Sequence, residues 1–368
     1  MNINNNFKKM LITVISSMFL LNGCGEEKAK TSLQAEIASA KTYQWKMVTS
    51  WPKNFPGLGM GPERFSKYVD EMSDGRLTIK VYGSGELVPG FEVFDAVSQG
   101  TAQMGHSGAY YWKGKIPASP IFSAIPFGMT ATEFNAWLHY GGGLALWQEL
   151  YEPFGIVPMA GGNSGAQFAG WFNKEISSMD DLKGLKMRIP GLGGEVFKRA
   201  GGVPVTLTGG EIFSSLQSGA IDASEWVGPY NDLAFGFHQA AEYYYSSVWH
   251  ETGTNLEFLV NAEALAELPK DLQKIVEVAA RAVNQDMLDE YNARNNIALK
   301  TLVEKHKVKL REFSPEIMKA LKGYTQEVLT EQVAKDADFA KIWKSYSAFL
   351  SSMREYNDLT LKAYYQNR

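Results

Sequence analysis

Short apolar runs alternate with amphipathic stretches along the first part of the chain. The runs are typical of strands, and apolar residues at intervals of three and four are typical of helices. Strands are predicted at 43–50, 77–82 and 102–105, and helices at 61–72 and 91–99. Because parallel neighbouring strands need a crossover connection, this β-α-β-α-β order predicts a parallel α/β sheet.

The same alternation returns in the middle of the chain and predicts a second domain. A helical stretch at 132–151 is interrupted by three glycines, and a helix at 195–200 is expected after the glycine-rich turn 191–194. Further strands are predicted at 156–161, 167–173, 186–189, 204–206 and 220–226, with a helix at 211–219. The strands predicted at 243–249 and 255–260 are candidates to cross back to the first domain.

Two long helical patterns follow. The first covers 269–305, and the second carries apolar residues at intervals of three and four from Phe339 to Tyr365. A helix of the second length reaches roughly 40 Å, more than one small domain requires. Its apolar face has two interpretations: packing across both domains of its own chain, or contact with a partner subunit.

Composition and charge narrow the functional classes. The 368 residues are 45% hydrophobic and 21% charged, which is typical of a globular protein of about two domains. The formal net charge is −4, and no run of lysine and arginine is present. This balance argues against nucleic acid as a partner.

The N-terminus has the pattern of a secretory signal. A basic start precedes the apolar run Met10–Leu21, and Leu-Asn-Gly-Cys ends at Cys24. This ending resembles the lipobox of bacterial lipoproteins and predicts a signal peptide at 1–23, a lipidated Cys24 and a small, polar tether at 24–42. The alternative is ordinary cleavage after Ala38–Ala40. Cys24 is the only cysteine, so no disulfide is expected.

The sequence matches known catalytic motifs only in part. Gly105–Ala109 (GHSGA) is a near-miss of the G-x-S-x-G elbow, and it makes Ser107 the candidate nucleophile of a hydrolase. Gly162–Ala166 misses the motif in the same way. The glycines of 191–194 lack dinucleotide-fold spacing, and no P-loop, H-E-x-x-H motif or cysteine cluster is present. The sequence therefore argues against an enzyme, with a Ser107 hydrolase kept as an alternative.

Lys186–Gly202 is the stretch with the clearest binding chemistry. Its strand–turn–helix pattern suits an anion, because backbone N–H groups at a helix N-terminus favour negative charge. Arg188 stands at the end of the strand, and a guanidinium can bind a carboxylate through two parallel hydrogen bonds. The alternative is an arginine in an ordinary surface ion pair.

Four blocks of the sequence have a recognisable pattern: LKGLKMRIPG (182–191), GGVPVTLTGGEIFSSLQSGAIDASEW (201–226), TSWP (49–52) and the segment 61–105. They resemble the periplasmic solute-binding proteins of TRAP (tripartite ATP-independent periplasmic) transporters, most closely the branch for 2-oxo acids and other small monocarboxylates. The similarity covers Tyr43 to the C-terminus. The resemblance implies an α/β, two-lobed periplasmic-binding-protein fold (type II-like) with a long lobe-bridging helix and an extended C-terminal helix.

The resemblance also implies approximate domain boundaries. Lobe I is expected at 43–163 plus about 254–285, and lobe II at 164–253 plus about 286–335. The C-terminal helix is expected at 336–368.

Site residues follow from the same resemblance, position by position. Arg188 matches the arginine that holds the solute carboxylate, and Gln167, Glu225 and Trp226 match the ligands of a cation that bridges protein and solute. Gln167 and Trp226 are expected at the solute as well, with Trp226 touching it directly. Glu251 matches a further acidic residue that could meet the cation or the solute. Oxygen ligands of this kind suit Na⁺ or Ca²⁺, and no organic cofactor is expected.

Aromatic residues after the first-lobe strands complete the expected site. Trp51, Tyr110 and Tyr111 follow predicted strands, so they are candidates for an opposing aromatic wall; core packing is the alternative.

The sequence thus predicts a lipid-anchored periplasmic binding protein that delivers a small 2-oxo or 2-hydroxy monocarboxylate to membrane permease subunits. A homodimer through the C-terminal helix is a further expectation. The rival functions are binding of a larger carboxylate, such as a dicarboxylate or sugar acid, and the Ser107 hydrolase. A longer ligand needs a second cationic anchor, and the sequence assigns none.

Overall fold

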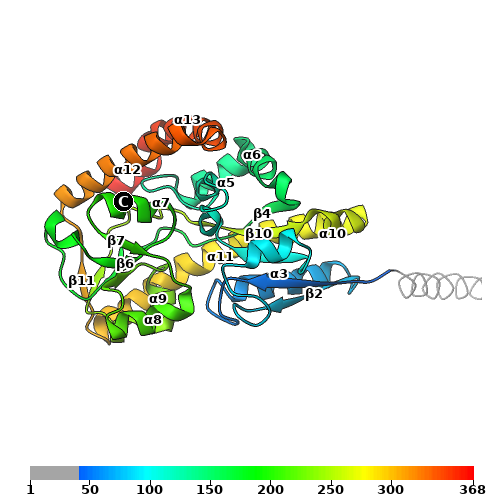
Figure 1. The fold of residues 1–368 in the computed structure, drawn as a ribbon, viewed down its shortest axis with the longest axis horizontal. Coiled ribbons are helices and arrows are strands. Elements are labelled where there is room, and N and C mark those ends of the chain that lie inside the picture. The colour runs from blue at the N-terminus through cyan, green and yellow to red at the C-terminus, as the bar shows by residue number, and fades with distance from the viewer. Residues whose placement is uncertain (1–40) are drawn as a thin grey trace, which may run out of the picture. The chain divides into compact units, whose positions relative to one another are not determined.

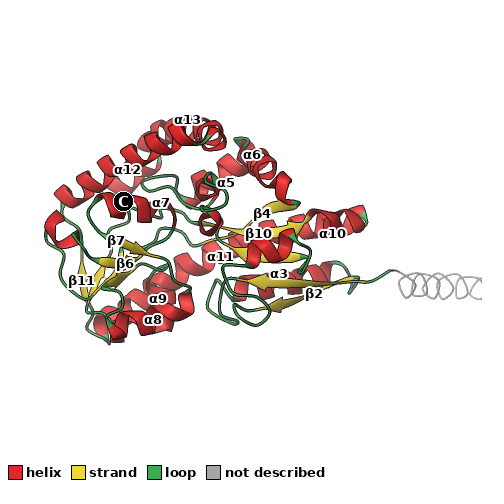
Figure 2. Ribbon diagram, viewed as in Figure 1, coloured by secondary structure: helices red, strands yellow, loops and turns green. Residues whose placement is uncertain are grey.

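The computed structural model describes residues 41–368. The predicted signal peptide, Cys24 and the tether up to residue 40 lie outside the described residues. Residues 44–368 form one compact unit with two separate β-sheets, visible as two groups of yellow strands in Figure 2. We call the part of the chain built on the first sheet lobe I and the part built on the second sheet lobe II.

The sheet of lobe I has the strand order β2-β1-β3-β10-β4. Its strands are β1 (Tyr43–Thr49), β2 (Leu77–Tyr82), β3 (Met104–Ser107), β4 (Ile156–Asn163) and β10 (Asn255–Asn261). β1 and β3 are parallel, as the alternating pattern predicted, whereas β10 is antiparallel to both β3 and β4. β10 returns from lobe II, so no crossover helix constrains its direction.

The sheet of lobe II has the order β11-β9-β5-β8-β6-β7. Its strands are β5 (Gly170–Phe172), β6 (Lys186–Arg188), β7 (Val203–Val205), β8 (Ala223–Ser224), β9 (Tyr243–Tyr245) and β11 (Lys309–Arg311). Several are shorter than predicted; β5 begins after Gln167, and β8 ends before Glu225. β9 stays in lobe II, so of the two predicted crossing strands only β10 joins the first sheet.

Helices cover both sheets (Figure 1). In lobe I they are α3 (Met60–Met72), α4 (Val93–Ser98), α5 (Ala131–Tyr140), α6 (Gly143–Tyr151) and α10 (Ala262–Glu267), with 3-10 turns η1 (Ala109–Trp112), η2 (Ser119–Phe122) and η3 (Glu152–Phe154). In lobe II they are α7 (Gly191–Arg199), α8 (Gly209–Ser218) and α9 (Pro229–Phe235), with η4 (Met179–Leu182) and η5 (Phe237–Gln239).

The start of α7 corrects one prediction. The helix begins at Gly191, so the glycines expected to form a turn are its first residues. Gly191 has φ +63°, and a Cβ there would lie 3.0 Å from Cβ of Tyr110. Glycine is therefore required both by the backbone conformation and by the approach of lobe I.

The long helix α11 (Lys270–Glu304) confirms the predicted bridge. It packs against α3 and β4 of lobe I and against α9 of lobe II, as Figure 1 shows. Arg64 of α3 pairs with Asp286 and Glu290, and Asn295 accepts a hydrogen bond from the Tyr230 backbone. No helix within residues 41–368 has the length and apolar character that crossing a bilayer requires.

The C-terminal part is a helical arm of α12 (Pro315–Lys335), α13 (Ala337–Leu359) and α14 (Leu361–Asn367). α12 packs on α7, and α13 packs on α5 and α6. The first half of the α13 stripe is buried against this chain: Phe339, Ile342, Tyr346 and Leu350. The helix predicted to continue to Tyr365 is broken at Thr360, and the residues around the break are exposed: Tyr356, Leu359, Leu361, Tyr364 and Tyr365.

Candidate functional site

Arg188 lies at the end of β6 and is 1% exposed. Its guanidinium donates to the Leu207 carbonyl (3.2 Å), to the Tyr111 hydroxyl (3.1 Å) and to the carboxylate of Glu225. Burial lowers the pKa of Arg188, but Glu225 together with Tyr111, Tyr110 and Glu251 outweighs burial and raises that pKa. Arg188 is the only lysine or arginine among the buried residues of 41–368. The surface ion pair weighed from the sequence is thereby wrong.

Glu225 reaches Arg188 because of strand register. β6 and β8 are parallel, with Arg188 opposite Ser224, so the next residue emerges beside the guanidinium. Oε1 of Glu225 pairs with Arg188, while its buried Oε2 has no hydrogen-bond partner among the described residues. Burial raises the pKa of Glu225 and the Arg188 charge opposes that rise.

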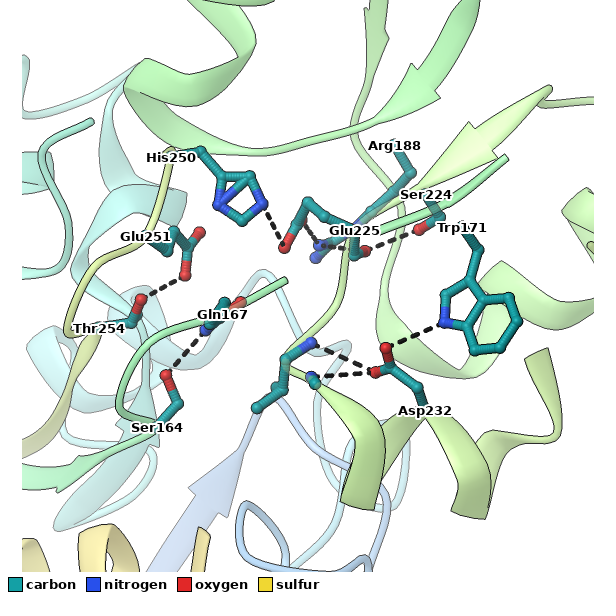
Figure 3. A network of polar contacts seen from close by, with 12 residues as sticks. Ser164, Gln167, Trp171, Arg188, Ser224, Glu225, Asp232, His250, Glu251 and Thr254 are labelled. Atoms are coloured by element: carbon teal, nitrogen blue, oxygen red, sulfur yellow. Dashed lines mark hydrogen bonds and ion pairs between the residues drawn. The ribbon is translucent and has the colours of Figure 1, made fainter. Parts of the chain in front are cut away.

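Hydrogen bonds to Asp232 hold the turn that follows Trp226. Asp232 accepts a hydrogen bond from the Trp171 indole (3.0 Å), which Figure 3 shows. It also accepts from the backbone N–H of Gly228 (3.2 Å) and from the Tyr244 hydroxyl (2.7 Å). The Trp226 ring lies 5.0 Å from the Arg188 guanidinium carbon. Burial raises the pKa of Asp232 to about 6. The network fixes the backbone that carries the Trp226 carbonyl.

Gln167 and Glu251 come from two connecting segments that bind each other. The Gln167 backbone N–H donates to the Glu251 carbonyl (2.9 Å). The Gln167 amide donates from Nε2 to Ser164 (2.8 Å), and its buried Oε1 accepts no hydrogen bond from residues 41–368. Glu251 accepts from the Thr254 hydroxyl, and burial raises its pKa to about 7. Gln167 was expected at a strand end, but it precedes β5.

Lobe I covers this cluster with aromatic rings. Trp51 follows β1 and lies edge-on to Trp226 of lobe II, with ring centroids 6.1 Å apart. Its indole donates to Nδ1 of His106 (2.7 Å), so Nε2 of that ring carries the proton and donates to the Gly161 carbonyl (2.8 Å). Tyr110 and Tyr111 lie in η1, with ring centroids 4.6 Å apart. The hydroxyl that reaches Arg188 belongs to Tyr111.

The donor set suits a hard cation. Figure 3 shows Gln167, Glu225, His250 and Glu251 around a common region. Two buried oxygens, Oε1 of Gln167 and Oε2 of Glu225, are without partners among residues 41–368. Within the same residues no cluster of three or more His, Cys, Asp or Glu side chains could hold a metal ion. The set is thus one of amide and carboxylate oxygens, which suits Na⁺ or Ca²⁺ better than zinc.

The hydrolase alternative gains no support. Ser107 is fully buried in β3, and its hydroxyl pairs with that of Ser50 at 2.6 Å. Both nitrogens of the neighbouring His106 are occupied by Trp51 and Gly161. The serine therefore stands in a strand, without the exposed turn and free general base that a nucleophile elbow requires.

The sequence analysis missed two residues of this region. His250 was not singled out, yet its Nε2 lies 4.0 Å from Oε2 of Glu225. Asp232 was not singled out, although an acid in the first turn of a helix, here its fourth residue after the cap Gly228, is favoured near the free N–H groups of the helix N-terminus. That signal was present in the sequence.

Known proteins match both the sequence and the fold. The family model described as bacterial extracellular solute-binding protein, family 7, matches residues 47–336. A monocarboxylate 2-oxoacid-binding periplasmic protein of Nostoc sp. (strain PCC 7120) is 43% identical over 91% of this chain and 92% of its own.

Two solved TRAP periplasmic solute-binding proteins have a TM-score of 0.87 and cover 89% of this chain and 100% of their own. The one from Pseudoalteromonas atlantica T6c, with bound sodium and pyruvate, is 43% identical. The one from Colwellia psychrerythraea, with bound calcium and pyruvate, is 44% identical. These matches confirm the two-lobed fold, and the chain belongs to the DctP family of bacterial extracellular solute-binding proteins.

Proposed function

We propose that this protein binds a small 2-oxo or 2-hydroxy monocarboxylate, similar to pyruvate or lactate, together with Na⁺ or Ca²⁺. Arg188 pairs with the solute carboxylate; Gln167, Glu225 and the Trp226 carbonyl hold the cation. The observation that carries the proposal is the buried Arg188–Glu225 pair beside two unpartnered oxygens. The relatives that bind pyruvate with sodium or calcium support it.

Charge balance explains why solute and cation bind together. Arg188 and Glu225 neutralise each other across a buried ion pair. A solute carboxylate alone would add an uncompensated negative charge, and a cation alone would add a positive one, both costly in a buried site. Bound together with Na⁺, they keep the site neutral, and with Ca²⁺ the site is neutral when Glu251 is ionised as well; the cation supplies positive charge between two carboxylates. Glu251 is a further acid at the edge of this group.

The size and charge of the site favour a small monoacid over the larger solutes. Trp51, Trp226 and Tyr111 enclose the guanidinium region. A dicarboxylate needs a second cationic anchor, and Arg188 is the only buried lysine or arginine of residues 41–368.

Calorimetry tests the proposal directly. Wild-type protein titrated with pyruvate in Na⁺ or Ca²⁺ should bind it, and chelation or removal of the cation should weaken binding. Arg188→Ala should lose on the order of a hundredfold in affinity, because truncating one partner of a buried charge pair costs several kcal/mol. Arg188→Lys keeps the charge and controls for folding. If Arg188→Ala, shown folded by circular dichroism, binds pyruvate as tightly as wild type, the proposal fails.

Transport and anchoring belong to the same proposal. Membership of an extracellular solute-binding family supports a periplasmic location. We assign delivery to TRAP permease subunits, and lipid anchoring through Cys24, on the family resemblance and the lipobox-like sequence. Mass spectrometry of the N-terminal peptide of membrane-purified protein checks the anchor; an unmodified N-terminus near residue 41 would support ordinary cleavage.

The lobe boundaries and the homodimer are proposed from the sequence analysis. The exposed apolar residues around Thr360 are the surface on which a second copy would pack. Light scattering on full-length protein and on a chain ending at Lys335 distinguishes a dimer through this arm from a monomer.

A further inference from the structure

His250 is a buried imidazole whose hydrogen-bonding groups are unused. The residue is 1% exposed, and neither Nδ1 nor Nε2 has a hydrogen-bond partner among residues 41–368. His106 is equally buried, but both of its nitrogens are paired. Buried polar atoms are nearly always hydrogen-bonded, because an unpaired one loses its interaction with water without replacement. The two ring nitrogens of His250 are therefore available to a bound molecule, since residues 41–368 give them no hydrogen bond.

The ring is fixed in its place by its surroundings. The Trp249 carbonyl accepts from the Phe127 backbone (2.7 Å), and the Glu251 carbonyl accepts from Gln167 (2.9 Å). A Cβ added to Gly193 of α7 would lie 3.3 Å from Cβ of His250, so the helix packs directly on this residue. The backbone on both sides of His250 is thus held, and the ring faces Glu225, as Figure 3 shows.

The ring offers a hydrogen-bond donor to whatever binds beside it. An imidazole has at least one N–H donor in either protonation state. In the proposed site the charges of Arg188, the cation, Glu225 and the solute carboxylate are already paired with one another, so the partner left for His250 is an uncharged part of the solute.

We propose that His250 contacts the solute and hydrogen-bonds the oxygen on the carbon next to its carboxylate. The inference rests on the proposed function and names the residue that distinguishes 2-oxo and 2-hydroxy acids from plain carboxylic acids. Both an oxo and a hydroxyl oxygen accept from an imidazole N–H, so one residue serves both solute types. A plain acid leaves the buried imidazole unpaired, which is a strong basis for rejection.

A competing account gives His250 a different partner. A small shift would bring its Nε2, now 4.0 Å away, within hydrogen-bond distance of Glu225 Oε2. His250 would then position Glu225 for the cation and would have no direct contact with the solute. The two accounts differ in one respect: a positioning residue affects every carboxylate equally, whereas a solute contact affects only those with an oxygen at carbon 2.

The test is a comparison of solutes and variants at saturating Ca²⁺. Pyruvate, lactate and propionate are titrated into wild type, His250→Phe and His250→Gln, with displacement calorimetry for weak binders. His250→Phe should bind pyruvate and lactate about tenfold more weakly, the cost of an unmade hydrogen bond in a buried site, with propionate changed less than twofold. His250→Gln keeps a donor and should recover most of the loss. His139→Phe, on α5 outside the site, is the matched control and should match wild type.

An equal loss for all three solutes, or no loss for pyruvate, overturns the inference. If His250→Phe does not fold, NMR of wild type with ¹⁵N-labelled histidine rings is the second measurement. The His250 signal is assigned by its absence in His250→Gln. Pyruvate should move that signal and propionate should not; no shift with pyruvate overturns the contact. If wild type binds no monocarboxylate with any cation, the proposed function itself fails, which is a separate result.

Discussion

The two lobes bury polar groups in different ways. Lobe II buries opposite charges, Arg188 and Glu225, side by side at adjacent strand ends. Lobe I buries neutral groups in closed hydrogen-bonded sets: His106 between Trp51 and Gly161, and Ser107 with Ser50. In the proposed site, lobe II therefore supplies the charged groups from one edge of its sheet, and lobe I supplies the aromatic rings that cover them. Hinged closure of two such lobes is a common binding device.

The largest effect is expected at the charged pair of lobe II. Glu225→Gln leaves Arg188 buried without a compensating charge, so the free energy of unfolding should fall by about 3 kcal/mol, and cation binding should be lost. Urea denaturation and Ca²⁺ calorimetry measure the two effects. The control is Glu195→Gln, which removes a partly exposed pair with Lys113 and should change stability little. Equal stability of the two variants would remove the distinction between the lobes.

The next largest effect on stability is expected at Trp51, an uncharged contact of lobe I. Trp51→Phe removes the indole donor to His106 and part of the contact with Trp226, and should cost about 2 kcal/mol of unfolding free energy. Solute affinity should fall as well, because the ring belongs to the wall over Arg188. Trp45→Phe, at a buried tryptophan within β1, the strand that Trp51 follows, is the control: it should destabilise the protein without weakening pyruvate binding. Unchanged pyruvate affinity in Trp51→Phe would mean that the ring is only core.

The comparison of the lobes also predicts an effect of pH on stability, because lobe I buries the acid Glu257 without pairing it with a cation. Glu257 in β10 accepts hydrogen bonds from the Trp112 indole and from the Tyr151 hydroxyl (3.0 Å), and burial raises its pKa to about 8. A pKa above that of the unfolded chain means that Glu257 contributes stability below about pH 4.5, and that this contribution is lost as the pH rises toward 8.

Glu257→Gln should therefore flatten the pH dependence of unfolding free energy between about pH 5 and pH 8, where one such group changes it by at most about 1.4 kcal/mol per pH unit. Urea unfolding of both proteins across this range is the measurement. Groups other than Glu257 titrate equally in both proteins, so their contribution cancels in the difference. Parallel pH curves would show that Glu257 is charged in the folded protein.

Strand register explains which parts of the site could be predicted from sequence. Arg188 and Glu225 follow short strands whose pattern is readable, and the parallel pairing of β6 and β8 brings them together. The length of α11 was equally readable from its period. His250 stands in a connecting segment without periodicity, and only the folded chain places it beside Glu225. The break at Thr360 gave no signal, because threonine is only slightly unfavourable in a helix.

The smallest expected effect on pyruvate affinity concerns two neighbouring tyrosines of lobe I, Tyr110 and Tyr111. The sequence analysis named Tyr110 and Tyr111 together as candidates for the aromatic wall, and the hydroxyl that accepts from Arg188 is that of Tyr111, at 3.1 Å. Tyr111→Phe should weaken pyruvate binding by about threefold, because Arg188 keeps its bonds to Leu207 and Glu225 and loses one neutral acceptor. Tyr110→Phe is the matched variant and should change affinity less. A larger loss in Tyr110→Phe would reverse the assignment and would place that hydroxyl on the solute. Neither change alters the charge of the site, so the cation dependence of pyruvate binding should stay as in wild type. A changed cation dependence would show that lobe I shares the electrostatic role proposed for lobe II.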